Sequence, residues 1–153
     1  MYLHEMGQRK CDPQGCGHYG ASRGPRKHKG VDLCMPDSSS LGGGTPIQCR
    51  FSGEVVKVGL AYSDKDKRHV RYVAIKLGDW YARIFYVDPI VKVGDKVTPD
   101  SIIGTSLELG TFYKGITEHV HLEVYKLIDK NKGMHNKRNF SYIDPNVVLE
   151  FMK

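Results

Sequence analysis

Two histidines and a glutamate occupy alternate positions in the segment His119-Val-His121-Leu-Glu123. Successive side chains of a β-strand point to opposite faces, so a strand here would place His119, His121 and Glu123 on one face and apolar residues on the other. Partly buried imidazoles need polar partners, and they commonly serve as metal ligands or as acid/base groups. Taken alone, the pattern fits two solvated surface histidines equally well.

A second segment, His28-Lys-Gly30-Val-Asp32, offers an imidazole and a carboxylate four residues apart. In an extended chain these side chains face the same way, and the glycine between them leaves room for an ion or a substrate backbone. A helix would also bring His28 and Asp32 together, but the central glycine disfavours it. With His121 they form a set of three ligands suited to Zn²⁺, which leaves a fourth position for water, as in catalytic zinc sites. The thermolysin-type H-E-x-x-H signature is absent from the sequence.

Short segments of strand length must position these side chains. They are rich in β-branched and aromatic residues, turn-forming residues separate most of them, and they span 31–35, 47–51, 54–58, 71–77, 82–87 and 119–125. A Gly-Asp turn within 92–97 predicts a tight β corner, and Asp144-Pro145 can begin a helix over 147–152. The sequence therefore predicts a mostly β fold: a single antiparallel-sheet domain with a groove floored by the sheet and zinc at one end of that floor.

Length and composition fit one domain. The chain has 153 residues, and its first 27 are rich in Gly, Arg and Lys without a sustained period. We expect residues 1–27 to form an irregular N-terminal arm and residues 28–153 to form the β-sheet zinc domain.

The net charge of +6 favours an anionic partner: nucleic acid, an acidic membrane or a cell-wall polymer. Nucleic acid is disfavoured because the N-terminal basic residues are interrupted by Gly and Pro and carry no recognition motif. No apolar run approaches the roughly 20 residues of a transmembrane segment, and we expect no signal peptide in this chain. The oligomeric state stays open.

The four cysteines fall into two pairs, Cys11/Cys16 and Cys34/Cys49, without C-x-x-C spacing. Pro and Gly between Cys11 and Cys16 allow the chain to turn back on itself, which predicts one disulfide. A second disulfide, between Cys34 and Cys49, is predicted to join the strands that flank the Gly-rich segment 38–44. The alternative is four reduced, buried cysteines. Disulfides would indicate an oxidising, extracytoplasmic compartment.

Several of these motifs occur together and in a defined order: Tyr19-Gly20, Arg23 and Arg26, His28-x-Gly-x-Asp32-Leu33, and His119-x-His121-x-Glu123. In type and order they resemble the motifs of lysostaphin/LytM-type zinc endopeptidases, whose fold is a duplicated hybrid motif-like sheet domain. The resemblance covers most of the chain. It implies that His28, Asp32 and His121 hold Zn²⁺ and that His119 acts in catalysis. It also implies a peptide substrate, most naturally a peptidoglycan stem or cross-bridge.

Further segments resemble the leukocyte cell-derived chemotaxin branch and its bacterial relatives: Cys11-x4-Cys16-Gly17, His28-Lys-Gly-Val-Asp32, Phe85-Tyr-Val87 and residues 113–121. The peptidases carry a second catalytic histidine in a Tyr-x-His pattern, and the spacing here assigns Val87 to that position. Losing one oxyanion donor costs about 10²- to 10³-fold in turnover. We therefore expect a slow peptidase, a peptidase in which His69, His18 or Tyr86 substitutes, or a secreted zinc-binding protein without turnover that acts as a chemotaxin-like binding module.

Overall fold

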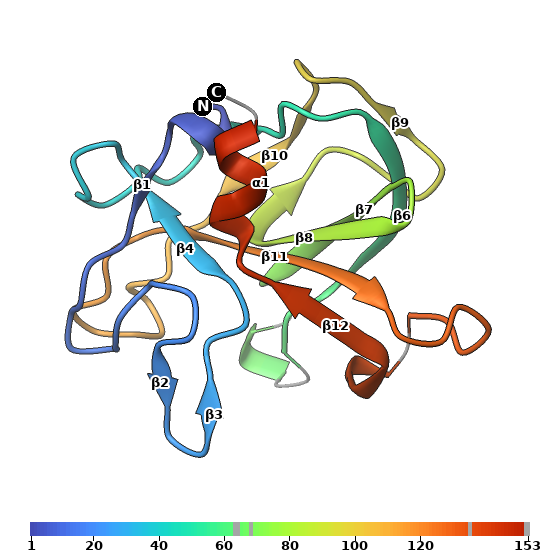
Figure 1. The fold of residues 1–153 in the computed structure, drawn as a ribbon. Coiled ribbons are helices and arrows are strands. Elements are labelled where there is room, and N and C mark those ends of the chain that lie inside the picture. Colours follow the sequence, from blue (N-terminus) through green and yellow to red (C-terminus); the bar gives the residue numbers. More distant parts are fainter. Residues whose placement is uncertain (63–64, 68, 135, 152–153) are drawn as a thin grey trace.

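One large antiparallel sheet dominates the computed structural model, which describes residues 1–62, 65–67, 69–134 and 136–151 (Figure 1). Its strands are β1 (Gly7–Gln8), β4 (Val31–Cys34), β5 (Pro46–Gln48), β6 (Gly53–Leu60), β7 (Arg71–Leu77), β8 (Trp80–Pro89), β9 (Lys96–Val97), β10 (Ile102–Ser106), β11 (Val120–Leu127) and β12 (Phe140–Ile143). A hairpin of β2 (Ser22–Arg23) and β3 (Arg26–Lys27) forms a second, two-stranded sheet. The predicted mostly β, antiparallel fold is confirmed.

The strand order β1-β4-β11-β8-β7-β6-β9 places β11 between β4 and β8. The two segments that carry the candidate ligands are therefore direct neighbours, and His121 lies opposite Asp32 across the β4–β11 pair. The predicted bounds 71–77 are those of β7, and the other predicted strands differ at their ends by up to three residues. Hydrophobic patterning was sufficient to find these strands because each contributes at least one buried apolar side chain to the core.

An apolar core covers one face of the sheet. It includes fully buried side chains from β4, β5, β7, β8 and β11: Val31, Ile47, Val73, Ile75, Ile84 and Leu122. The C-terminal helix α1 (Pro145–Phe151) adds Leu149 to this core, and Asp144 caps the helix by accepting from the backbone N–H of Asn146 at 3.0 Å. The helix follows the predicted segment, of which Met152 lies outside the described residues. No helix in the described ranges is long and apolar enough to cross a membrane.

The N-terminal residues are more ordered than the sequence pattern predicts. The 3₁₀ turn η1 (Leu3–Glu5) inserts Leu3 fully into the core, and β1 extends the main sheet by pairing with β4. The packing of Leu3 explains this order, because one buried leucine is worth roughly 1.5–3 kcal/mol. The division into an arm over 1–27 and a domain over 28–153 stays a prediction.

The cysteines follow the prediction for one pair and contradict it for the other. Cys11 and Cys16 form a disulfide, whereas Cys34 and Cys49 are free and buried. The two free thiols face carbonyl oxygens of different residues. Cys34 Sγ lies 3.5 Å from the backbone oxygen of Gly7, and Cys49 Sγ lies 3.5 Å from that of Phe51. Burial raises the pKa of Cys34 to about 11. The predicted Cys34–Cys49 disulfide is wrong, because the two residues serve as small apolar side chains in the core.

Candidate metal centre

Three ligand atoms converge at the junction of β4 and β11: His28 Nε2, Asp32 Oδ1 and His121 Nδ1. The two histidine nitrogens lie 3.0 Å apart, His121 Nδ1 lies 2.9 Å from Asp32 Oδ1, and His28 Nε2 lies 3.2 Å from the same oxygen. Ligands of a tetrahedral Zn²⁺ at about 2.0–2.2 Å lie roughly 3.3–3.6 Å from each other. The triangle is therefore close to the size that zinc requires, and these residues could hold a metal ion.

Gly30 makes this convergence possible. A Cβ atom at Gly30 would lie 2.9 Å from His121 Cε1 and would also collide with the backbone oxygen of Leu122. The sequence pattern suggested that Gly30 leaves room for an ion or a substrate. In the structure its missing side chain leaves room for the imidazole of His121, so the glycine shapes the site through a ligand.

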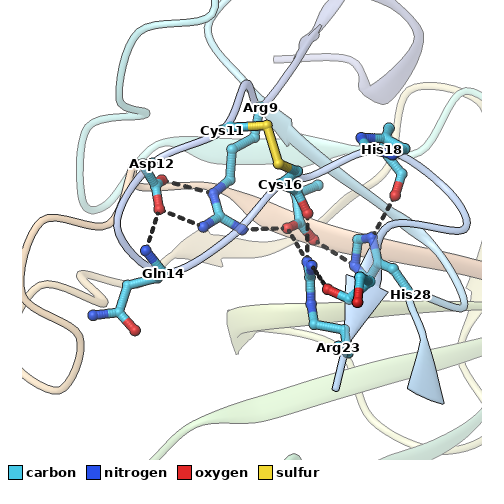
Figure 2. Close-up of a disulfide and its surroundings, with 10 residues drawn as sticks. Arg9, Cys11, Asp12, Gln14, Cys16, His18, Arg23 and His28 are labelled. Carbon is cyan, nitrogen blue, oxygen red and sulfur yellow. Dashed lines mark hydrogen bonds and ion pairs between the residues drawn. A yellow bond between two sulfur atoms is a disulfide. The ribbon is translucent and has the colours of Figure 1, made fainter. Parts of the chain in front are cut away.

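Hydrogen bonds on the outer side of each ring orient the two imidazoles. His28 Nδ1 lies 2.9 Å from the His18 carbonyl oxygen (Figure 2), and His121 Nε2 lies 3.0 Å from Glu123 Oε1. Because these oxygens accept, the outer nitrogens carry protons, and the inner nitrogens of both rings face Asp32 Oδ1, where neutral rings would offer their lone pairs to a metal ion. Such outer partners are typical of metal-ligating histidines. His18 contributes this carbonyl, while its own side chain is exposed.

A buried ion pair stands behind His121. Arg83 Nε donates to Glu123 Oε2 at 3.0 Å, and Nη2 makes a second contact with the same oxygen. The guanidinium carbon lies 5.0–5.5 Å from the centroids of four aromatic rings, those of Tyr72, Phe85, Tyr125 and Phe140. Arg83 holds Glu123 in the orientation that accepts from His121. The only sequence signal for Arg83 is a charged residue within an apolar strand.

The electrostatics of the cluster favour a cation. Burial would lower the pKa of His121, but hydrogen bonds to Asp32 and Glu123 outweigh it and raise that pKa to about 9. Burial would raise the pKa of Asp32, but His121 and His28 hold it well below its usual range. The donor set thus stabilises positive charge at its centre, which fits a divalent metal ion.

The second carboxylate oxygen of Asp32 is held from the N-terminal side. Arg9 Nη1 donates to Asp32 Oδ2 at 2.7 Å, while Arg9 Nε and Nη2 contact Asp12 at 2.9 and 2.7 Å beside the disulfide (Figure 2). Arg23 Nη2 donates to the Cys16 carbonyl oxygen at 2.6 Å and lies 3.7 Å from Asp32 Oδ2. The disulfide loop therefore fixes two arginines at a candidate ligand. No motif in the sequence indicates Arg9.

Replacing both Cys11 and Cys16 with serine is expected to lower the free energy of unfolding by about 2 kcal/mol, because the bond closes a short loop in the unfolded chain. Denaturant unfolding, compared with the parent protein, measures the change. Cys49→Ser, which alters a free thiol away from the loop, shows the effect of substituting a cysteine that forms no bond. A double variant as stable as the parent would contradict the prediction.

His119 lies beside the triangle but is not part of it. Its Nδ1 lies 2.6 Å from the Thr117 carbonyl oxygen, which makes Nδ1 the protonated nitrogen. Nε2 is then unprotonated and lies 3.6 Å from Asp32 Oδ2. Burial lowers the pKa of His119, so the neutral ring is favoured. His119 has the geometry of a base next to a metal site.

Val87, which the resemblance assigns to the missing catalytic position, does not face the site. Val87 is fully buried in the apolar core, and Tyr86 faces the site instead. The β7–β8 register pairs Tyr72 with Phe85 and Arg71 with Val87, so Tyr86 has no partner on β7. The backbone φ of Tyr86 is 70°. This bulge interrupts the alternation of side chains, which a count along the sequence assumes.

Tyr86 lies beside two histidines, His121 on β11 and His119 directly before that strand. Its ring lies edge-on to His119 at 5.4 Å between centroids and 6.3 Å from His121. Its hydroxyl lies 3.0 Å from that of Tyr62, and burial raises the pKa of Tyr86 to about 12. His69 is exposed, and the centroid of its ring lies 5.1 Å from that of Phe112. It does not line the cavities that flank the ligand cluster. Of the side chains of His69, His18 and Tyr86, that of Tyr86 lies at the site.

Two cavities, of about 440 and 380 Å³, flank the ligand cluster. Both are lined by His28, His121, Tyr62 and Tyr86, so they form the two halves of one groove. The cluster therefore lies where the two halves meet.

Comparisons with known proteins agree with this architecture. Residues 26–136 match a family described as "Domain of unknown function (DUF8155) N-terminal domain". The chain is 32% identical over 126 residues to leukocyte cell-derived chemotaxin-2 of Bos taurus. The alignment covers 79% of this chain and 75% of that protein. Identity to the Mus musculus protein is 33% over 120 residues, and that alignment covers 75% of this chain and 71% of the mouse protein.

Solved structures share the fold at lower identity. The catalytic domain of lysostaphin from Staphylococcus simulans has a TM-score of 0.59 at 22% identity and covers 91% of each chain. LytU has a TM-score of 0.61 at 24% identity, covering 95% of this chain and 86% of that chain. The chain belongs to the leukocyte cell-derived chemotaxin-2 family, within the group of proteins that share the lysostaphin/LytM-type peptidase fold.

Proposed function

We propose that this protein is a zinc metalloendopeptidase that hydrolyses peptide bonds in the stems or cross-bridges of peptidoglycan. The observation that carries the proposal is the position of His119: an unprotonated imidazole nitrogen 3.6 Å from the second oxygen of Asp32, next to a cluster that lines a groove. His28, Asp32 and His121 would hold the ion. Zn²⁺ in such a site lowers the pKa of water and polarises a carbonyl oxygen.

The protein's own residues would then orient the reactants and move the proton. His119 Nε2 accepts a proton from the attacking water and passes it to the leaving amine. The hydrogen bond to Thr117 fixes the ring for both steps. Arg9 and Glu123 hold Asp32 and His121 in the orientation that binds metal.

Tyr86 would take the place of the second catalytic histidine. Its raised pKa keeps the phenol protonated at neutral pH, so it can donate a hydrogen bond to the carbonyl oxygen as negative charge develops there. The hydroxyl of Tyr62, 3.0 Å away, orients the phenol.

The direct test incubates zinc-loaded protein with purified peptidoglycan and counts newly formed amine termini. The proposal expects release of amines that stops when a chelator removes the metal. An extracytoplasmic location belongs to the same proposal, and the Cys11–Cys16 disulfide supports it.

Replacing Tyr86 with phenylalanine is expected to reduce the rate of amine release by about 10²-fold, because the ring stays and the oxyanion donor is lost. Zinc stoichiometry should not change. Tyr62→Phe is the comparison variant and should have a smaller effect, since it removes the hydroxyl that orients the phenol of Tyr86 but leaves that phenol in place. Equal rates for Tyr86→Phe and the parent would remove Tyr86 from the mechanism.

A second candidate function is a secreted zinc-binding protein without turnover. Two observations favour it: the β8 side chain beside both His119 and His121 is a tyrosine, Tyr86, and not a second histidine, and the relatives at 32–33% identity are named as chemotaxins. Absence of new amines from several peptidoglycan types, with zinc bound and the fold intact, would select this alternative.

A further inference from the structure

The larger half of the groove is lined by an unusual concentration of positive charge. Five exposed cationic side chains, here called the basic rim, border it: Arg26, Lys27, Lys29, Lys137 and Arg138. They come from β3, from the segment leading to β4, and from the 3₁₀ turn η3 (Lys137–Asn139), which is more than 100 residues further along the chain. Two separate parts of the sequence thus bring cations to one cavity.

No carboxylate of the cavity is available to neutralise the basic rim. Among the described residues that line this cavity, Glu123 is the only acidic one, and Arg83 and His121 already engage it. Within the described part of the chain, no ion pair involves a member of the basic rim, and Lys29 lies over the ring of Tyr142 at 5.8 Å. The rim is therefore an uncompensated positive surface beside the ligand cluster.

The other half of the groove differs in character. Its lining beyond the ligand cluster includes uncharged side chains: Gln14, Leu109, Tyr113 and Ile116. It contains fewer cations: Arg9 engages Asp32 and Asp12, Arg23 lies 3.7 Å from Asp32, and Arg26 of the basic rim lines both halves. The groove is thus basic on one side of the candidate metal centre and mostly neutral on the other.

We propose that the groove binds acidic peptides in one direction, with carboxylates of the peptide on the basic rim and uncharged residues in the neutral half. The proposal rests on the proposed function only in taking a peptide as the ligand. Single exposed ion pairs contribute little, but several cations around one concave site attract anions together. A peptide is favoured over an anionic polysaccharide because the rim lies in the same cavity as His121 and Tyr86.

Isothermal titration of zinc-loaded protein with blocked octapeptides tests this. The probes contain six glycines followed by two glutamates, the reverse order, or two glutamines in place of the glutamates. We expect one glutamate order to bind roughly tenfold more tightly than the glutamine peptide, from about two favourable pairs. The advantage should shrink at high salt, and the other order should bind more weakly because only one half of the groove is basic.

Variants identify the surface responsible. Replacing both Lys137 and Arg138 with alanine should remove most of the glutamate preference. Replacing Lys130 and Lys132 removes the same charge from exposed positions that do not line the groove, and the preference should remain. Equal affinity for glutamate and glutamine peptides, or a preference that survives Lys137→Ala/Arg138→Ala, would overturn the proposal.

Mass spectrometry of the same mixtures separates this inference from the proposed function. Glutamate-selective binding without cleavage would keep the acidic-peptide subsite and remove the peptidase. Cleavage of all peptides without selectivity would keep the peptidase and remove the subsite. If a heparin oligosaccharide bound through Lys137 and Arg138 while no peptide showed selectivity, the basic rim would be a polysaccharide surface and the proposal would fail.

Discussion

Replacing His119 with alanine is expected to reduce amine release from peptidoglycan by about 10²- to 10⁴-fold, the usual contribution of a general acid/base. Bound zinc should stay at about one per chain. The structure separates these two effects, because His119 Nε2 faces the second oxygen of Asp32 while the ligand triangle is closed by His28, Asp32 and His121. Kinetics and metal analysis on one preparation measure both.

His69→Ala is the matched control for this variant, since it removes an exposed imidazole that does not line the groove. Its rate should equal that of the parent. If His119→Ala lost its zinc, His119 would be a ligand and not a base. If it kept both zinc and full activity, another group would have to accept the proton.

The sequence was sufficient wherever the relevant geometry is local. Alternation along a strand predicted that His119, His121 and Glu123 share a face, and His121 contacts Glu123 as that pattern requires. The segment from His28 to Asp32 is extended enough to bring both side chains to the same ion site. Such patterns depend on backbone periodicity alone, which neighbouring residues determine.

Sequence spacing failed to predict the site where the backbone departs from regular strand alternation, or where two contacting residues are far apart in the sequence. The bulge at Tyr86 shifts every later side chain of β8 by one position, so Tyr86 faces the site and Val87 the core, which the Tyr-x-His spacing of the resemblance does not indicate. Arg9 reaches Asp32 across 23 positions of sequence, and no spacing rule predicts that contact. Cys34 and Cys49 flank a Gly-rich segment, yet they are buried as separate free thiols.

Replacing His121 with alanine is expected to abolish stoichiometric zinc binding, because only two of the three converging protein ligands remain. Replacing Glu123 with glutamine should have a smaller effect, about 10- to 100-fold weaker zinc binding, since the ligands stay and only the partner that orients His121 changes. Competition with a chromophoric chelator measures the affinities, and circular dichroism confirms that each variant is folded.

The comparison between these variants assigns the ligands. Tyr62→Phe is the control within the groove, because it changes a lining side chain that is no ligand candidate, and its zinc affinity should match that of the parent. The Glu123→Gln substitution also leaves the guanidinium of Arg83 without its buried carboxylate partner. The unfolding free energy of this variant must therefore be measured together with its zinc affinity. Full zinc stoichiometry in His121→Ala, or in Asp32→Asn, would show that another set of residues holds the metal. Weaker zinc binding by Glu123→Gln, in a variant that stays folded, would instead establish that the Arg83–Glu123 pair tunes His121 as a ligand.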